Sequence, residues 1–170
     1  MYRVDFTSTG LKNDTTRNAI EEVVWNLGGS STYNDVTPSM FYTAERGTTV
    51  YEGHATTWNG KIGLMYPSDY GYATSGGTTE DRAACLATVF YNKWYGDCSR
   101  NDYLFNTNRH QWTLTSHSAN ARDVFYVFGD VDRNGAYGAF VVRPALFLKS
   151  NILVDKGTGA KSDPYTLSVN

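Results

Sequence analysis

The chain has 170 residues, 41% of them hydrophobic, and a formal net charge of -2. This length suits one domain with a sizeable core and is short for two ordinary domains, so we expect residues 1–170 to form a single domain. The absence of any Lys or Arg block longer than two residues excludes a basic nucleic-acid footprint. No apolar run approaches the roughly 18 residues of a membrane span, so we expect no direct membrane insertion.

The first expected element is a helix over residues 14–27. Asn13 or Asp14 supplies the N-cap, and Gly28-Gly29 ends the helix. Its apolar residues recur at helical spacing: Ile20, Val23, Val24 and Leu27.

Short strands are expected next. The runs 40–42 and 48–51 are rich in strand-forming residues and are separated by a turn at Arg46-Gly47. Asn59-Gly60 predicts a further turn, followed by an apolar strand up to Tyr66. Residues 67–72 then break the pattern and are expected to form a loop.

A second, short helix is expected to begin at Thr78 or Thr79. Glu80-Asp81 would lie in its first turn, where the helix dipole favours acidic residues. Two helices ahead of a mostly antiparallel sheet define an α+β fold class.

The sheet is expected mainly after residue 98. Residues 111–115, 124–128 and 138–143 read as strands, with a turn over 129–135 between the last two. A last strand, 165–167, follows the turn at 157–159. Of the tryptophans, Trp58, Trp94 and Trp112 are expected in or near the core.

Cys85 and Cys98 are the only cysteines. In a surface protein this pair would form one disulfide, and closing the loop would stabilise the fold by roughly 3 kcal/mol. In a cytosolic protein the two would remain reduced thiols. A zinc site is not expected, because two ligands without a nearby His pair are too few.

Sequence motifs for chemistry are weak. Residues 130–135 match the start of an EF-hand loop, but Val141 stands at the twelfth position, where a bidentate acid is required, so we expect a hairpin turn. No nucleophile-elbow motif is present, and we expect neither a cofactor nor a catalytic residue. Arg143 is expected to be structural, because a guanidinium at a strand end can bind several oxygens.

Composition favours binding. There are 25 aromatic residues, 13 of them Tyr, and only 19% of the chain is charged. Tyr gives large amphipathic contact area for little conformational entropy, so this composition is typical of extracellular binding proteins. The alternative is an all-β core that uses aromatics as strand formers.

Three runs resemble a known family: 58–74, 111–115 and 142–151. They are similar to C-type-lectin-like domains at the C-termini of surface and pilin-like proteins of gut Firmicutes and their phages. They also resemble the variable proteins diversified by retroelements. The resemblance extends from about Leu11 to Leu167. It implies a strongly twisted, mostly antiparallel sheet and a piece of a longer protein, as Met1-Tyr2-Arg3 also indicates.

In the retroelement systems, error-prone copying at template adenines rewrites Asn-type codons and leaves scaffold codons unchanged. The mixed residues between Ser116 and Val141 are of that kind. By resemblance the hypervariable, ligand-binding surface would be drawn from Ser116, His117, Ser118, Asn120, Arg122, Asp123, Tyr126, Phe128, Asp132, Arg133, Asn134, Tyr137, Gly138, Phe140 and Val141. The expected scaffold comprises Val124, Val127, Ala136, Ala139 and the run 142–148.

The resemblance implies a non-enzymatic, extracellular receptor-binding or adhesion domain on a virion or bacterial cell surface. Its partner would be a protein or glycan on a target cell. The chain lacks the Glu-Pro-Asn and Trp-Asn-Asp motifs of calcium-dependent lectins, so we expect no metal. Two rivals remain: a formylglycine-generating-like enzyme with a cleft near Asp69, Tyr70 and Tyr72, and a structural pilus or tail module. The sequence leaves the oligomeric state open.

Overall fold

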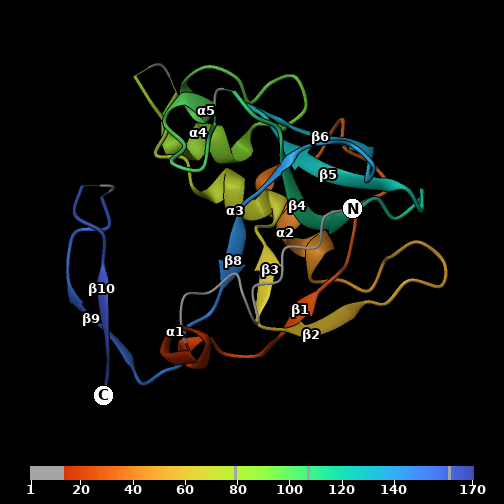
Figure 1. The fold of residues 1–170 in the computed structure, drawn as a ribbon. Coiled ribbons are helices and arrows are strands. Elements are labelled where there is room, and N and C mark those ends of the chain that lie inside the picture. Colours follow the sequence, from red (N-terminus) through yellow and green to blue (C-terminus); the bar gives the residue numbers. More distant parts are fainter. Residues whose placement is uncertain (1–13, 79, 107, 161) are drawn as a thin grey trace. The chain divides into compact units, whose positions relative to one another are not determined.

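The computed structural model describes residues 14–78, 80–106, 108–160 and 162–170. Within these ranges the chain is α+β, with five short helices and small, mostly antiparallel sheets (Figure 1). It divides into two compact units. The larger comprises Val24–Asn59 and Gly63–Ala145, and the smaller comprises Met1–Val23, Gly60–Ile62 and Leu146–Asn170.

The smaller unit contains one helix and a β-hairpin. The helix α1 (Asp14–Ala19) is followed by a bridge between Ile20 and Leu148. The hairpin pairs β9 (Ile152–Lys156) with β10 (Thr166–Val169) in antiparallel register. The expected last strand is thereby confirmed with a small shift, whereas β9 was not predicted.

The expected helix over 14–27 is wrong beyond Ala19. Residues Val23–Asn26 form the strand β1, which pairs with β2 (Thr57–Gly60). Val24 is 62% exposed and Trp25 only 3%, an alternation that suits a strand. β-branched Val23 and Val24 favour the extended backbone once a partner strand is present. Asn13 lies outside the described residues.

Two segments expected as strand and loop are helices. α2 (Pro38–Glu45) replaces the strand at 40–42, and residues 48–51 form no strand. Phe41 and Glu45, one helical turn apart, are both fully buried. α3 (Pro67–Tyr72) replaces the loop. Both helices have proline in the first turn, where its fixed φ suits a helix start.

The segment around Asn59-Gly60 is extended, because these residues end β2 and do not form a turn. The apolar strand after it is confirmed as β3 (Ile62–Leu64), which pairs with β8 (Pro144–Leu146). The second expected helix is present as α4 (Arg82–Ala87) but begins later than expected: Asp81 is its N-cap and accepts from the Ala84 N–H at 2.8 Å, so Glu80 and Asp81 precede the first turn. Thr79 lies outside the described residues. α5 (Asp97–Arg100) was not predicted.

The largest sheet has the strand order β6-β5-β4-β7. β4 (Gln111–Ser116) and β5 (Asp123–Val127) confirm two expected strands and pair antiparallel. β6 (Val131–Gly135) pairs antiparallel with β5 and replaces most of the expected turn over 129–135. β7 is only Val141–Val142 and runs parallel to β4, so the third expected strand is much shorter than 138–143.

One face of this sheet builds the core of the larger unit. Phe125 and Val127 point toward the helices and are fully buried, and Phe125 meets Phe41 of α2 edge-on at 5.0 Å. Trp94 is buried in the same cluster. Trp58 is 45% exposed, so its expected core position is wrong.

The disulfide Cys85–Cys98 lies in this core and joins α4 to α5. This confirms the pairing and is consistent with an oxidising compartment. A membrane-crossing helix is absent from the described ranges: their helices are too short, or not apolar enough, for one.

Candidate functional site

The second face of the four-stranded sheet carries aromatic side chains. The register places Trp112 opposite Tyr126, and Tyr126 opposite Asp132. Directly opposed residues of neighbouring strands share a face. Since Phe125 and Val127 point to the core, Trp112, Tyr126 and Asp132 belong to the outward face.

Five rings pack together there and are called the aromatic face: His110, Trp112, Tyr126, Phe128 and Phe140. His110 stacks between Phe128 and Phe140, with centroid distances of 4.2 and 4.8 Å. Phe140 also lies 4.5 Å from Trp112 and 4.9 Å from Tyr126. Such pairs contribute about 0.5–1.5 kcal/mol each beyond area burial, so the rings hold one another in place.

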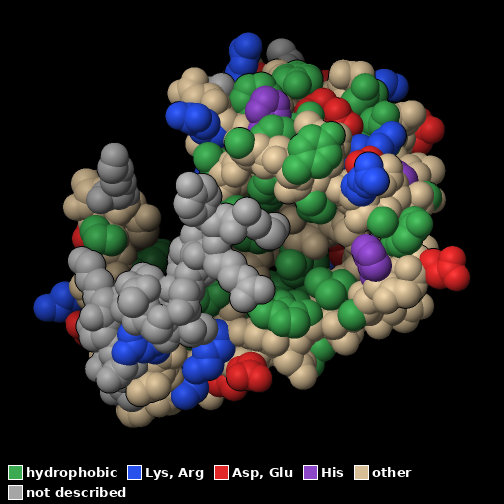
Figure 2. Space-filling model, turned by 45° about the vertical axis from the view of Figure 1, so that its right-hand side comes forward, with side chains coloured by type: hydrophobic (Ala, Val, Ile, Leu, Met, Phe, Trp, Pro, Cys, Tyr) green, Lys and Arg blue, Asp and Glu red, His purple; other side chains and the backbone are tan. Residues whose placement is uncertain are grey.

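The aromatic face is packed but not covered. Trp112 is 9% exposed and forms its base, while His110, Tyr126, Phe128 and Phe140 are partly exposed. Tyr137, in the segment between β6 and β7, is 87% exposed. Figure 2 shows hydrophobic side chains mixed with acidic, basic and histidine side chains at the height of β5 and β6. The aromatic face is therefore packed within itself and partly exposed to solvent.

Polar groups adjoin the rings at β6. The Tyr126 hydroxyl donates to Asp132 Oδ2 at 3.3 Å. Burial, and then the charges of Asp132 and Asp130, raise the pKa of Tyr126, so this hydroxyl remains a donor at neutral pH. Asp130 is buried and accepts from the Asn92 N–H at 3.2 Å. Burial also raises the pKa of Asp130.

Three residues of the expected binding set do not face outward. His117 and Asp123 are buried, and Arg133 lies opposite Phe125 on the core side of the sheet. Arg133 forms an ion pair with Asp123, and its guanidinium lies 5.0 Å from the Tyr33 ring centroid. This ion pair therefore joins β5 to the edge strand β6 on the core side of the sheet.

His117 has the environment of a core histidine. Its Nδ1 accepts from the Ala119 N–H at 3.2 Å, and its ring lies 5.9 Å from Phe125. Burial, followed by the charge of Arg133, lowers the pKa of His117. The neutral imidazole is therefore the favoured form at neutral pH.

The remaining members of the expected binding set lie on the outward face of the strands or in the loops beside them. Asn120 and Arg122 are exposed in the loop between β4 and β5, where Asn120 Oδ1 accepts from the Arg122 N–H at 3.0 Å. The exposed members are Asn120, Arg122, Asn134, Tyr137 and Val141. The partly buried members, besides Arg133, are Ser116, Ser118, Tyr126, Phe128, Asp132, Gly138 and Phe140.

The expected scaffold set is only partly buried. Val127 is in the core, whereas Val124 shares the outward face with Tyr126, and Ala136 and Ala139 are exposed. In the run 142–148 the hydrophobic side chains of Val142, Leu146, Phe147 and Leu148 are exposed. The expected scaffold therefore includes exposed positions, and the assignment of these residues to the scaffold stays a prediction.

Sequence reasoning left His110 out of the binding set, whereas the expected position of Trp112 in or near the core is confirmed. His110 precedes Trp112 by two residues, so the alternation along β4 places both on one face. Extending the strand alternation by two residues toward the N-terminus from Trp112 would have identified His110. Trp112 is buried as expected, but beneath Phe140 on the outward side.

The cleft expected by the enzyme rival is only partly present. Tyr70 is fully buried in the core, and one carboxylate oxygen of Asp69 accepts from the Tyr66 N–H at 2.9 Å at the start of α3. Asp69 and Tyr72 do line an open cavity, together with residues that include Met65 and Arg143.

Comparison with protein-family models, with curated proteins and with solved structures gives no match for this chain. The role of the aromatic face is therefore inferred from its own geometry and chemistry.

Proposed function

We propose that this chain is a non-enzymatic ligand-binding domain of C-type-lectin-like fold, and that its aromatic face contacts a protein or glycan on a target cell surface. The observation that carries the proposal is the combination of packing and exposure in the five rings. Large apolar surface on a folded domain marks interaction sites more often than chance would give.

The geometry suits a binding anchor. The rings are already ordered by one another, so little side-chain entropy is lost when a partner covers them. Aromatic anchors within a polar rim are the usual energetic centre of an interface. Asp132, Asn134 and Arg122 provide such a rim, and Tyr137 extends the apolar area.

Diversification of this surface is the second part of the proposal. The outward and loop positions of the expected variable set could change without altering the core, because Phe125 and Val127 carry the packing on the opposite side. We place the domain on a virion or bacterial surface, and the disulfide supports an extracellular location.

The binding experiment compares two variants on an array of purified glycans and cell-surface proteins. Phe128→Ala removes one ring of the aromatic face, and Tyr137→Ala, combined with it, removes the exposed ring between β6 and β7. Trp58→Ala is the matched control, because it removes an exposed aromatic from β2, outside this sheet. We expect the double variant to lose about tenfold or more in affinity, and the control to bind as the wild type does. Equal losses in both would contradict the proposal.

A permanent packing role is the alternative that oligomeric state can distinguish. A structural pilus or tail module would bury the aromatic face against a neighbouring subunit. Sedimentation of the purified chain gives its oligomeric state. In the species that sedimentation shows, we expect Tyr137 to react with a tyrosine-modifying reagent. A stable oligomer that protects Tyr137 would favour the structural module.

Diversification has its own test in the gene neighbourhood. We expect a near-copy of the DNA that encodes residues 116–143, differing only at adenines, beside a reverse-transcriptase gene. Absence of that copy would remove the diversification claim and leave the binding claim standing.

A further inference from the structure

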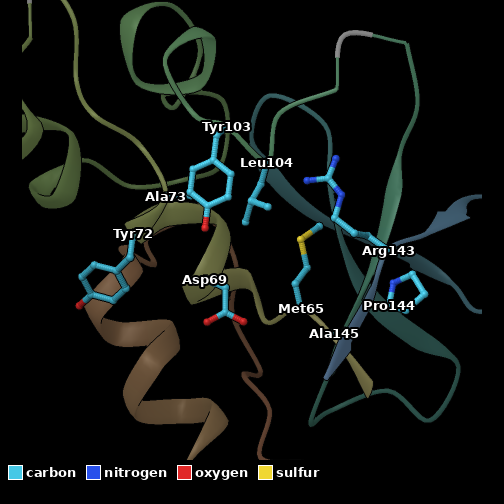
Figure 3. A pocket seen from close by; sticks show the side chains of 9 residues that line it. All are labelled: Met65, Asp69, Tyr72, Ala73, Tyr103, Leu104, Arg143, Pro144 and Ala145. Carbon is cyan, nitrogen blue, oxygen red and sulfur yellow. The ribbon is translucent and has the colours of Figure 1, made fainter. Parts of the chain in front are cut away.

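A second candidate site lies in the larger unit, on different residues from the aromatic face. It is an open cavity of about 400 Å³ (Figure 3). Met65, Leu104 and Pro144 give it apolar walls, and Tyr72 and Tyr103 contribute exposed rings. This volume lies near the lower end of small-molecule sites, which span about 300–1,000 Å³. It suits a small ligand.

Arg143 supplies a cation to this cavity. It follows β7 directly and precedes β8, and its side chain is partly exposed. Across the described residues Arg143 makes no ion pair or hydrogen bond. A guanidinium offers a planar fork of donors that matches a carboxylate. The expectation that Arg143 binds several carbonyl or carboxylate oxygens at a strand end is therefore not met among the described residues.

Asp102 is the acid whose charge acts on Arg143. It is 4% exposed; its Oδ1 accepts from the Leu104 N–H at 2.8 Å, and its Oδ2 has no hydrogen-bond partner. Burial raises the pKa of Asp102 to about 7, while the Leu104 N–H and the Arg143 charge oppose that rise. Asp102 therefore carries only part of a negative charge at neutral pH and leaves the Arg143 charge incompletely balanced.

Asp69 provides an acceptor elsewhere in the same cavity. Figure 3 shows Asp69 and Arg143 on opposite sides of Met65. One Asp69 oxygen is used at the start of α3, and the side chain is otherwise exposed. A second acidic group on a ligand would be repelled by Asp69, whereas an ammonium group would be attracted.

We propose that this cavity binds a small amino carboxylate with an apolar body, whose carboxylate pairs with Arg143, whose ammonium group pairs with Asp69, and whose apolar part covers Met65 and Leu104. The class includes apolar amino acids and short apolar peptides. The site does not depend on the function of the aromatic face.

Isothermal titration of the full chain tests the site with L-phenylalanine and glycyl-L-phenylalanine, which differ in the separation of their charges. L-Phenylalaninamide lacks the carboxylate, and hydrocinnamate lacks the ammonium group. We expect saturable binding of at least one of the first two. Loss of either charge should weaken it by about tenfold to a hundredfold, the range for hydrogen bonds to charged groups.

Variants assign the contacts. Arg143→Gln should lower the affinity for the amino carboxylate as much as amidation of the ligand does. It should leave the affinity for the amide unchanged. Arg143→Lys keeps the charge but loses the fork, so an intermediate affinity is expected. Arg100→Gln, in α5 and outside the cavity, is the control and should bind as the wild type does. Near-UV circular dichroism shows whether each variant is folded.

Three results would overturn the proposal: no saturable binding of either probe at millimolar concentration, equal affinity for acid and amide, or unchanged affinity in folded Arg143→Gln. None of them bears on the aromatic face, whose test uses a different surface and a different ligand.

Discussion

Glu45 makes the stability of the larger unit depend on pH. Its side chain is fully buried at the end of α2. Oε1 accepts from the Ser68 N–H at 2.9 Å, and Oε2 contacts the Ser68 hydroxyl and lies 3.2 Å from Arg46 Nη1. Burial raises the pKa of Glu45 from 4.5 to about 7, despite the hydrogen bonds from Ser68 and the charge of Arg46, which favour the ionised form.

The raised pKa of Glu45 determines how the free energy of unfolding changes with pH. The folded state holds the proton more tightly than the unfolded state, so ionisation costs folding free energy. The contribution of Glu45 is most favourable below pH 4.5, falls as the pH rises to about 7, and is constant above that. A rise of the pKa from 4.5 to about 7 corresponds to about 3 kcal/mol, because one pKa unit is about 1.36 kcal/mol.

Glu45→Gln tests this directly. The amide oxygen can still accept from the Ser68 N–H, but the side chain cannot ionise. We expect the free energy of unfolding of Glu45→Gln, relative to wild type, to increase by about 3 kcal/mol between pH 4.5 and about 7. Urea denaturation followed by tryptophan fluorescence measures it, because Trp94 and Trp112 are buried in the same unit.

Taking the difference removes the other groups that titrate in this range. Asp102, whose pKa burial also raises to about 7, contributes equally to wild type and variant. Glu52→Gln is the matched control, since it removes an exposed carboxylate from the same unit and should give a profile parallel to wild type. Parallel profiles for wild type and Glu45→Gln would refute the reasoning.

Three further predictions concern the core and the surface. Replacing Cys85 and Cys98 by serine should lower the unfolding free energy by about 3 kcal/mol through loop entropy, measured by urea denaturation; an unchanged value would show that the disulfide does not constrain the unfolded chain. Phe125→Ala should cost about 3–5 kcal/mol because it opens a cavity beside Phe41, and a loss below about 1 kcal/mol would place Phe125 outside the core. Tyr137→Ala should change the melting free energy by under about 0.5 kcal/mol, since the side chain is mostly solvated; a larger loss in calorimetry would assign Tyr137 to the fold.

The sequence could predict elements whose local and long-range preferences agree. β4 and β5 alternate cleanly and have turns at their ends, and α4 forms close to the expected segment, with Asp81 as its N-cap. The segment 14–27 shows the opposite case. Its helical spacing is real, but Val23 and Val24 also suit a strand, and pairing with β2 decides between the two. That partner is more than thirty residues away, so no local pattern contains it.

The binding surface could be predicted as a region but not residue by residue. A period of two cannot tell which alternate residue is buried, and only pairing with β4 and β6 places Tyr126 outward and Asp123 inward. β6 was missed because Val131–Gly135 is polar and ends in Asn-Gly, a combination that also suits a turn. The cavity beside Arg143 joins α3, β8 and the loop after α5, and no sequence spacing indicates it.

The claim that outward side chains serve a partner and not the fold is tested most directly by one combined variant. Asn120, Arg122, Asn134 and Tyr137 are all exposed and lie beside the outward face, so each replacement by Ala should change folding by under about 0.5 kcal/mol. The measurement is the affinity of this quadruple variant for the glycan or protein that the wild type binds on the array. The melting midpoint of the variant is recorded on the same sample. We predict a melting midpoint within a few degrees of wild type and a loss of binding. A collapsed melting transition, or unchanged affinity in a folded variant, would contradict the account.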